Sequence, residues 1–157
     1  DTAPEFQKEY GDLLLEQGET DEGYARMERA VELSGDAEAT LLPFAEALLR
    51  AREYDHLERL IARSTGQRKS SAIWELVRPI FTVVLDGIRA GEKGVEQPIE
   101  AFGRAVEKHR GSLPIEEDLD EIGRYALVLD DHHRWVVETM VDIREERQSM
   151  EDLTTGR

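Results

Sequence analysis

The feature that most constrains the fold is a pattern of large and small residues that occurs twice, 34 residues apart. Small residues let neighbouring helices approach closely, and large ones fill the space between them. The paired positions are Tyr10 and Phe44, Gly11 and Ala45, Leu14 and Leu48, Gly18 and Arg52, Gly23 and Leu57, Met27 and Ile61, and Ala30 and Ser64. A fixed period of this length, with two helices in each period, predicts a stack of helical hairpins.

Apolar residues also recur at helical spacing along the whole chain, with glycine and proline between the runs. We expect eight helices in four antiparallel hairpins, because very short connections force consecutive helices to lie side by side. The fold class is therefore predicted to be all-α, in a single domain. The expected hairpins span about residues 4–34, 38–66, 71–111 and 116–150 of a domain covering 1–157.

Two prolines and one polar stretch mark expected interruptions. Pro43 falls in a first helical turn if Thr40 caps its helix, and there the missing N–H has no intrahelical partner. Pro79 should kink or break the apolar helix expected over residues 72–90. The polar stretch 64–71, with sequence STGQRKSS, is the best internal boundary. The final helix is expected to run from about residue 131 to 150.

The repeated pattern resembles the tetratricopeptide repeat family, whose unit is a helix-turn-helix of about 34 residues. The residues that carry the resemblance are Tyr10, Gly11, Leu14, Gly18, Gly23, Met27 and Ala30. They stand where the family has its large and small pair, its large apolar residue, its turn glycine and the small-large-small set of its second helix. The resemblance is closest over residues 4–64 and looser beyond. It implies a right-handed α-α superhelix, or solenoid, of about four hairpins.

In that family, the first helix of each unit lines a concave groove that holds an extended peptide or a partner helix. The resemblance therefore implies a mixed apolar and acidic surface suited to a basic or amphipathic segment. Its expected members are Glu5, Lys8, Asp12, Leu15, Glu16, Leu42, Glu46, Leu49, Arg50, Arg124, Leu127 and Val128. The alternative is that these residues are ordinary solvated helix positions.

One subtype of the family is excluded by the sequence. Members that grip a terminal carboxylate use asparagines, and this chain has none; Asp12 stands where the first would be. A second negative charge at that point would repel the carboxylate.

The charge balance limits the class of partner. The net charge is -15, with 35 acidic against 20 basic residues, and such a chain repels phosphate backbones and anionic lipids. We therefore expect a protein or peptide partner, no nucleic acid and no membrane.

The longest apolar run, 80–85, is too short to cross a bilayer, and we expect a cytoplasmic location. The acidic, lysine-poor composition fits a salt-loving or GC-rich source, or an ordinary acidic bacterial domain. A start at Asp1 rather than methionine suggests a processed product or part of a longer protein.

The residues with the greatest chemical interest are Asp130, Asp131, His132 and His133, which are possible metal ligands. Adjacent side chains on a helix point roughly 100° apart, however, so the four cannot converge unaided. The alternative is that Asp130 or Asp131 caps a helix and both histidines are solvated. The serines lack a nucleophile context, and no glycine-rich phosphate loop follows a strand. We expect no catalytic residue, no metal and no cofactor.

Three functions remain as hypotheses. The first is a non-catalytic scaffold that binds a basic or amphipathic segment in a concave groove. The second is a self-association module that buries the helix 73–88, or the face of Trp135, Val136 and Val137, between subunits. The third is a metal-dependent enzyme centred on Asp130, His132 and His133.

Overall fold

The structure is a computed structural model, and it describes residues 11, 18, 20–33, 38–64, 72–111, 119–146 and 149–155. Every regular element within these residues is an α-helix, so the all-α prediction is confirmed. None of these helices has the length and apolar character needed to cross a membrane. Contacts divide the chain into two units, residues 1–71 and 72–157. The division falls at the end of the polar stretch that the sequence marks as an internal boundary.

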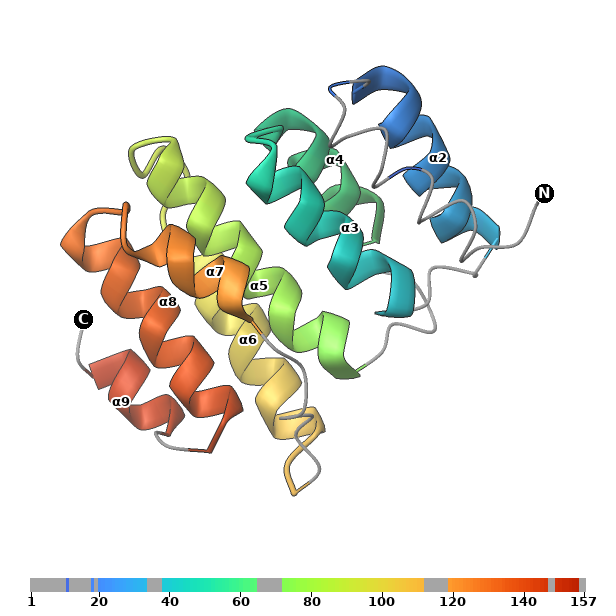
Figure 1. The fold of residues 1–157 in the computed structure, drawn as a ribbon. Helices are drawn as coiled ribbons and strands as arrows, with labels where there is room; N and C mark the ends of the chain where they lie inside the picture. The colour runs from blue at the N-terminus through green and yellow to red at the C-terminus, as the bar shows by residue number, and fades with distance from the viewer. Residues whose placement is uncertain are drawn as a thin grey trace. The chain divides into compact units, whose positions relative to one another are not determined.

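Unit 1 contains α2 (Thr20–Leu33), α3 (Glu38–Arg50) and α4 (Tyr54–Ser64) (Figure 1). Helix α3 packs against both of the others. Its apolar residues are buried almost without interruption, and α4 contributes Leu57 and Leu60 to the core. The predicted first helix lies outside the described residues, except for Gly11, which is helical.

The backbone at the turns supports the repeat of 34 residues. Gly18 has φ 82°, and Arg52, its counterpart in the second copy, has φ 59°. At Arg52 the helix ends as in a Schellman motif: its N–H donates to the Leu49 carbonyl at 3.1 Å, and the Glu53 N–H donates to the Leu48 carbonyl at 2.9 Å. Both copies therefore need a left-handed residue here, although only the first has glycine. The superhelical arrangement of the hairpins remains a prediction.

The expected position of Pro43 is wrong. Helix α3 begins at Glu38 rather than after Thr40, so Pro43 lies inside the helix and not in its first turn. A proline there removes one intrahelical hydrogen bond. The flanking Leu41, Leu42 and Phe44 are all buried, and the apolar packing they provide offsets that loss.

Gly11 lies close against α2. A Cβ atom at this position would come within 2.7 Å of the Met27 Cγ atom and 2.9 Å of the Gly23 carbonyl oxygen. We therefore expect Gly11→Ala to lower the free energy of unfolding by about 1–3 kcal/mol, as overpacking does. Gly123→Ala is the matched control, because a Cβ there meets nothing within 4 Å; it should be neutral or stabilising. Urea denaturation measures both changes, and an equal response of the two variants would contradict the close approach.

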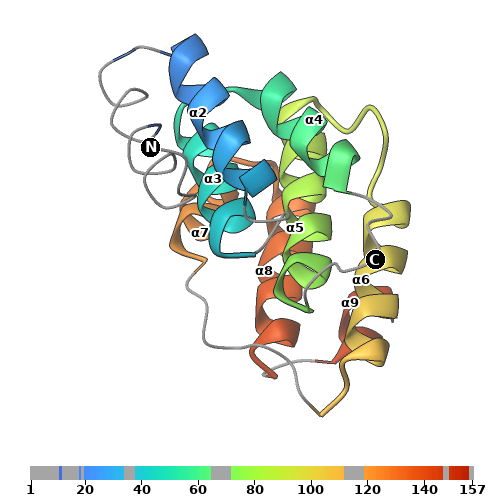
Figure 2. The same cartoon turned by 90° about the vertical axis from the view of Figure 1, so that its right-hand side faces the viewer.

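Unit 2 contains α5 (Ala72–Ile88), α6 (Glu96–Lys108), α7 (Asp120–Ala126), α8 (Asp131–Arg144) and α9 (Met150–Thr155). Helix α5 contacts α6, α7 and α8, while α9 contacts α8 (Figures 1 and 2). Most of α5 is buried, including Trp74, Phe81 and the stretch 83–86. The sequence 80–85 is as apolar as a buried strand, but here it forms the central helix of this unit.

The break expected near Arg78 is absent, since α5 continues past Pro79 without interruption. The Thr82 hydroxyl donates to the Arg78 carbonyl at 3.0 Å, as threonine does inside a helix.

Near the start of α5, Glu75 accepts hydrogen bonds from Lys108 at 2.8 Å and pairs with His109 at 3.2 Å. Burial raises the pKa of Glu75, but these two partners outweigh it and lower the pKa below its ordinary value.

The end of the last predicted helix is also wrong. Helix α8 ends at Arg144, and the chain turns at Glu146 with φ 62°. The Glu146 N–H donates to the Ile143 carbonyl at 3.0 Å and closes the helix end, and Arg144 in the last turn complements the helix dipole. A separate helix, α9, then begins after Ser149, whose backbone N–H donates to the Asp152 carboxylate at 2.9 Å. This contact is the half of a capping box in which the third helical residue reaches back to the cap.

Candidate functional site

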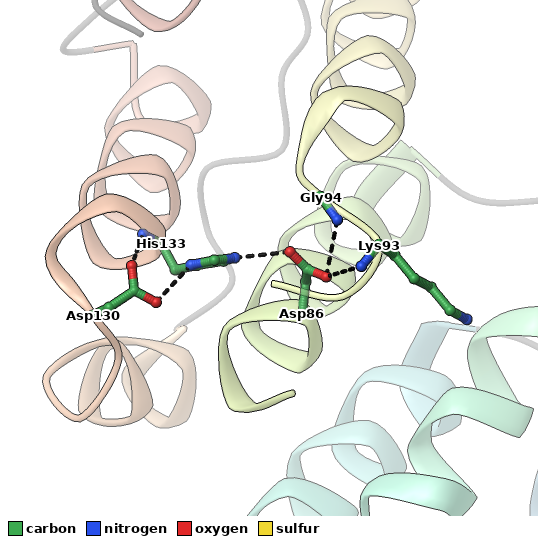
Figure 3. Close-up of polar contacts among 5 residues, drawn as sticks. All are labelled: Asp86, Lys93, Gly94, Asp130 and His133. Carbon is green, nitrogen blue, oxygen red and sulfur yellow. Dashed lines mark hydrogen bonds and ion pairs between the residues drawn. The ribbon is translucent and has the colours of Figure 1, made fainter. Parts of the chain in front are cut away.

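Two carboxylates hold one buried imidazole where α8 begins. The Nε2 atom of His133 lies 2.8 Å from the Asp86 Oδ2 atom, and its Nδ1 atom lies 2.7 Å from the Asp130 Oδ2 atom (Figure 3). The side chains of His133 and Asp86 are 9% and 4% exposed, whereas that of Asp130 is 52% exposed. We call Asp86, Asp130 and His133 the histidine cluster.

Local sequence explains how α8 positions the histidine. Asp130 is the N-cap of this helix, and its Oδ1 atom accepts the backbone N–H of His133 at 3.0 Å. The same carboxylate therefore contacts the backbone and the ring of one residue. The capping role expected for Asp130 is confirmed, while the expectation that both histidines are solvated is wrong. His132 is exposed, but His133 is one position further around the helix and is buried.

Asp86 connects this histidine to the loop between α5 and α6. Its Oδ1 atom accepts the backbone N–H groups of Lys93 at 2.9 Å and Gly94 at 3.1 Å, and the Lys93 side chain points away from the carboxylate (Figure 3). The loop has positive φ at Ala90, Gly91 and Gly94, so its backbone is folded tightly. Asp86 thus joins three segments: the end of α5, this loop and α8.

A glycine makes the contact between α5 and α8 close. A Cβ atom at Gly87 would lie 3.0 Å from the Leu129 Cδ2 atom and 3.1 Å from the His133 Cβ and Cγ atoms. Leu129 and His133 therefore both pack directly on the backbone of α5. The turn between α7 and α8 is therefore in contact with α5 through Leu129.

The electrostatics of Asp130 follow from its contacts. The backbone N–H of His133 is the main cause that lowers the pKa of the Asp130 carboxyl below its ordinary value. Slight burial acts in the opposite direction, and the contact with the His133 ring adds to the lowering. Asp130 is therefore ionised throughout the neutral range.

The cluster is poorly suited to catalysis. A general base needs a ring nitrogen that faces a substrate, and each nitrogen of His133 faces a carboxylate instead. A metal ligand needs a free nitrogen as well. In the part of the chain that the structure describes, no group of three or more His, Cys, Asp or Glu side chains has an arrangement that could hold a metal ion. The geometry thus gives no support to a metal centre at Asp130, His132 and His133.

The turn between α7 and α8 exposes apolar side chains. Leu127 is 61% exposed and Val128 is 75% exposed, and they are the exposed large apolar residues of the described ranges. Successive backbone hydrogen bonds stabilise this turn, from Leu127, Val128 and Leu129 to carbonyl groups three residues earlier, at 3.1–3.3 Å. The pair is therefore presented on an ordered backbone.

The predicted partner-binding residues have different environments. Glu5, Lys8, Asp12, Leu15 and Glu16 lie outside the described residues. Leu42 and Leu49 are buried, so they are core side chains and not an open surface. In unit 1, Glu46 is partly exposed and Arg50 is exposed; in unit 2, Arg124, Leu127 and Val128 are exposed. Arg124 donates to Glu121 on the same helix at 3.0 Å.

The faces suggested for self-association are already covered. From Trp74 to Leu85, most apolar residues of α5 are buried within the single chain, as are Val136 and Val137 on α8; Trp135 is partly exposed. In this structure, burial of these residues between subunits would require the fold to open. The geometry therefore does not favour this hypothesis.

Sequence reasoning missed Asp86 and the role of Gly87. The available signal was one carboxylate at the end of a long apolar run, next to a glycine inside a helical pattern. A charge on a buried helix needs a partner, but nothing in the sequence indicates that the partner is His133, 47 residues later.

Comparison with known proteins yields no relative: no family model, no curated protein and no solved structure matches the chain.

Proposed function

We propose that the protein is a non-catalytic protein-binding module and that the turn between α7 and α8 is its contact surface. The observation that carries this proposal is the exposure of Leu127 and Val128 on an ordered backbone. Contiguous exposed apolar surface marks interaction sites, whereas single exposed apolar side chains are common on any surface. The partner would cover both side chains.

Charge identifies the chemistry of that partner. The exposed carboxylates of Asp130 and Asp131 come two and three residues after Val128, and the chain as a whole carries a net charge of -15. A basic, amphipathic segment would place its apolar face on Leu127 and Val128 and its cations near the two carboxylates. This is the class of partner that the sequence predicts, at a smaller site than the predicted groove.

The resemblance to tetratricopeptide repeats also remains a proposal. It is supported in unit 1 by the left-handed backbone at Gly18 and Arg52 and by the approach of Gly11 to Gly23 and Met27. The carboxylate contacts at both ring nitrogens of His133 leave no ring nitrogen to face a substrate, so the proposal gives the histidine cluster no catalytic role.

A designed peptide tests the proposed surface. The probe is a labelled helical peptide with leucines on one face and lysines on the other, and its binding is followed by fluorescence anisotropy. We expect the double variant Leu127→Ser with Val128→Ser to bind at least about tenfold more weakly, because each apolar side chain contributes about 1.5–3 kcal/mol when fully buried. Binding should also weaken as salt is added.

The matched control replaces two other exposed apolar residues, Ala25→Ser with Ala62→Ser, and it should bind as the unchanged protein does. A second control peptide carries glutamate in place of lysine and should not bind. Equal affinity of the two double variants, or of the two peptides, would refute the proposal. The thermal midpoint of each variant shows that the fold is unchanged.

A further inference from the structure

We propose that His133 carries both ring protons in the folded protein at neutral pH, and that this imidazolium fastens the loop between α5 and α6 to the start of α8. Removal of one ring proton, as the pH rises, would then loosen both segments. The fastening would operate whether or not Leu127 and Val128 bind a partner.

The contacts of the ring determine how many N–H donors it needs. A neutral imidazole has one N–H donor and one nitrogen with only a lone pair, while the charged ring has two donors. Both nitrogens of His133 lie within 2.8 Å of a carboxylate oxygen. In the neutral ring, one of these contacts would place a lone pair against an ionised oxygen. Only the doubly protonated ring donates to both carboxylates.

The contacts of the two carboxylates disfavour protonation of Asp86 or Asp130 in place of the His133 ring. Asp130 accepts the backbone N–H of His133, which lowers the pKa of its carboxyl. Asp86 accepts two backbone N–H groups at one oxygen and faces the ring with the other, so its oxygens are already surrounded by donors. Acceptance of several donors is the arrangement that an ionised carboxylate takes. The proton therefore belongs on the ring.

Other titratable groups lie on α8 itself, where Asp131 is exposed, and on the elements packed against it. His132 lies beside the ring, edge-on, with the two ring centroids 5.6 Å apart. On α7, Glu121 and Arg124 pair with each other, and on α9, Asp152 accepts from Ser149. From α5 and its following loop, Asp86 faces the ring with its carboxylate, and Lys93 contributes its backbone N–H rather than its side chain (Figure 3).

Both segments that the ring joins also have backbone hydrogen bonds of their own. The loop has a left-handed backbone at Ala90, Gly91 and Gly94, and its N–H groups at Lys93 and Gly94 donate to Asp86. The first turn of α8 is capped by Asp130 through the His133 N–H. Loss of a ring proton would replace one attractive contact by a repulsive one. The fastening is therefore present at neutral pH and lost as the pH rises.

The first experiment observes the protons directly. Nitrogen NMR of the full chain, with labelled histidine, distinguishes protonated from unprotonated ring nitrogens. We expect both nitrogens of His133 to be protonated at pH 7. A signal from an unprotonated nitrogen of His133 at that pH would overturn the proposal.

The second experiment measures what the proton does. Amide hydrogen exchange of Lys93, Gly94 and His133 is compared with intrinsic exchange as the pH is raised from 7. We expect the protection of these three amides to fall at least about tenfold as the ring loses its proton, because hydrogen bonds to charged groups are the stronger ones. Amides in the middle of α6 should keep their protection.

Two variants separate the charge from the helix cap. Asp130→Asn removes one negative charge but keeps an N-cap of comparable strength, so the loss of protection should move to lower pH. His132→Gln changes the exposed neighbour and should leave the profile unchanged. If the amide protection of Asp130→Asn depends on pH as that of the unchanged protein does, the Asp130 carboxylate serves only as a helix cap and the proposal fails.

Discussion

Replacement of Asp86 by alanine is expected to lower the free energy of unfolding by about 3–5 kcal/mol, as loss of one partner from a buried ion pair does. The substitution leaves the Nε2 atom of His133 and the N–H groups of Lys93 and Gly94 without their acceptor. These groups are in or next to a buried site, so water replaces the lost contacts only in part. Urea denaturation at neutral pH measures the change.

The matched control is Asp131→Ala. Asp131 is the next residue after the cap of α8 and is exposed, so its carboxylate contributes mainly through the helix dipole, about 0.3–1 kcal/mol. A similar small loss for Asp86→Ala would show that the histidine cluster contributes little to stability.

Trp74→Ala is also expected to lower the free energy of unfolding by about 3–5 kcal/mol. Trp74 is buried in the first turn of α5, and its ring centroid lies 6.2 Å from that of Phe81. Removal of the indole leaves a cavity at the start of the central helix of unit 2. The free energy of unfolding from urea denaturation, followed by circular dichroism, reports the change.

Trp135→Ala provides the comparison, because Trp135 is partly exposed and its removal opens a smaller cavity. The chain has these two tryptophans only, so each variant also isolates the fluorescence of the other residue. Trp74 should emit at the shorter wavelength in the folded protein, as a buried indole does. Equal destabilisation by the two substitutions would contradict the burial of Trp74.

Local patterns predicted much of this fold. Helical spacing of apolar residues located α2, α5 and α6, and the recurrence of 34 residues indicated equivalent turns at Gly18 and Arg52. These features depend on residues close in sequence. The errors occurred where packing outweighs a local preference: Pro43 and Pro79 lie inside helices because the residues around them are buried.

The candidate site was predicted less well, because it depends on contacts between distant segments. The sequence indicated the Asp130 cap, since a capping aspartate acts within one turn. It did not indicate that His133 is buried, because that depends on the approach of α8 to Gly87 on another helix. The exposure of Leu127 and Val128 was predicted only through the resemblance, which also placed the buried Leu42 and Leu49 on the same surface.

The contact between Asp86 and His133 has a consequence for how this protein can diverge. A change at either residue alone leaves a buried polar group without its partner, and joint replacement by apolar residues still leaves the N–H groups of Lys93 and Gly94 without their acceptor. Descendants of this sequence should therefore keep both residues, or lose both together with a change in the loop between α5 and α6. Single-step intermediates between these two states would be rare, and the two positions would be inherited together.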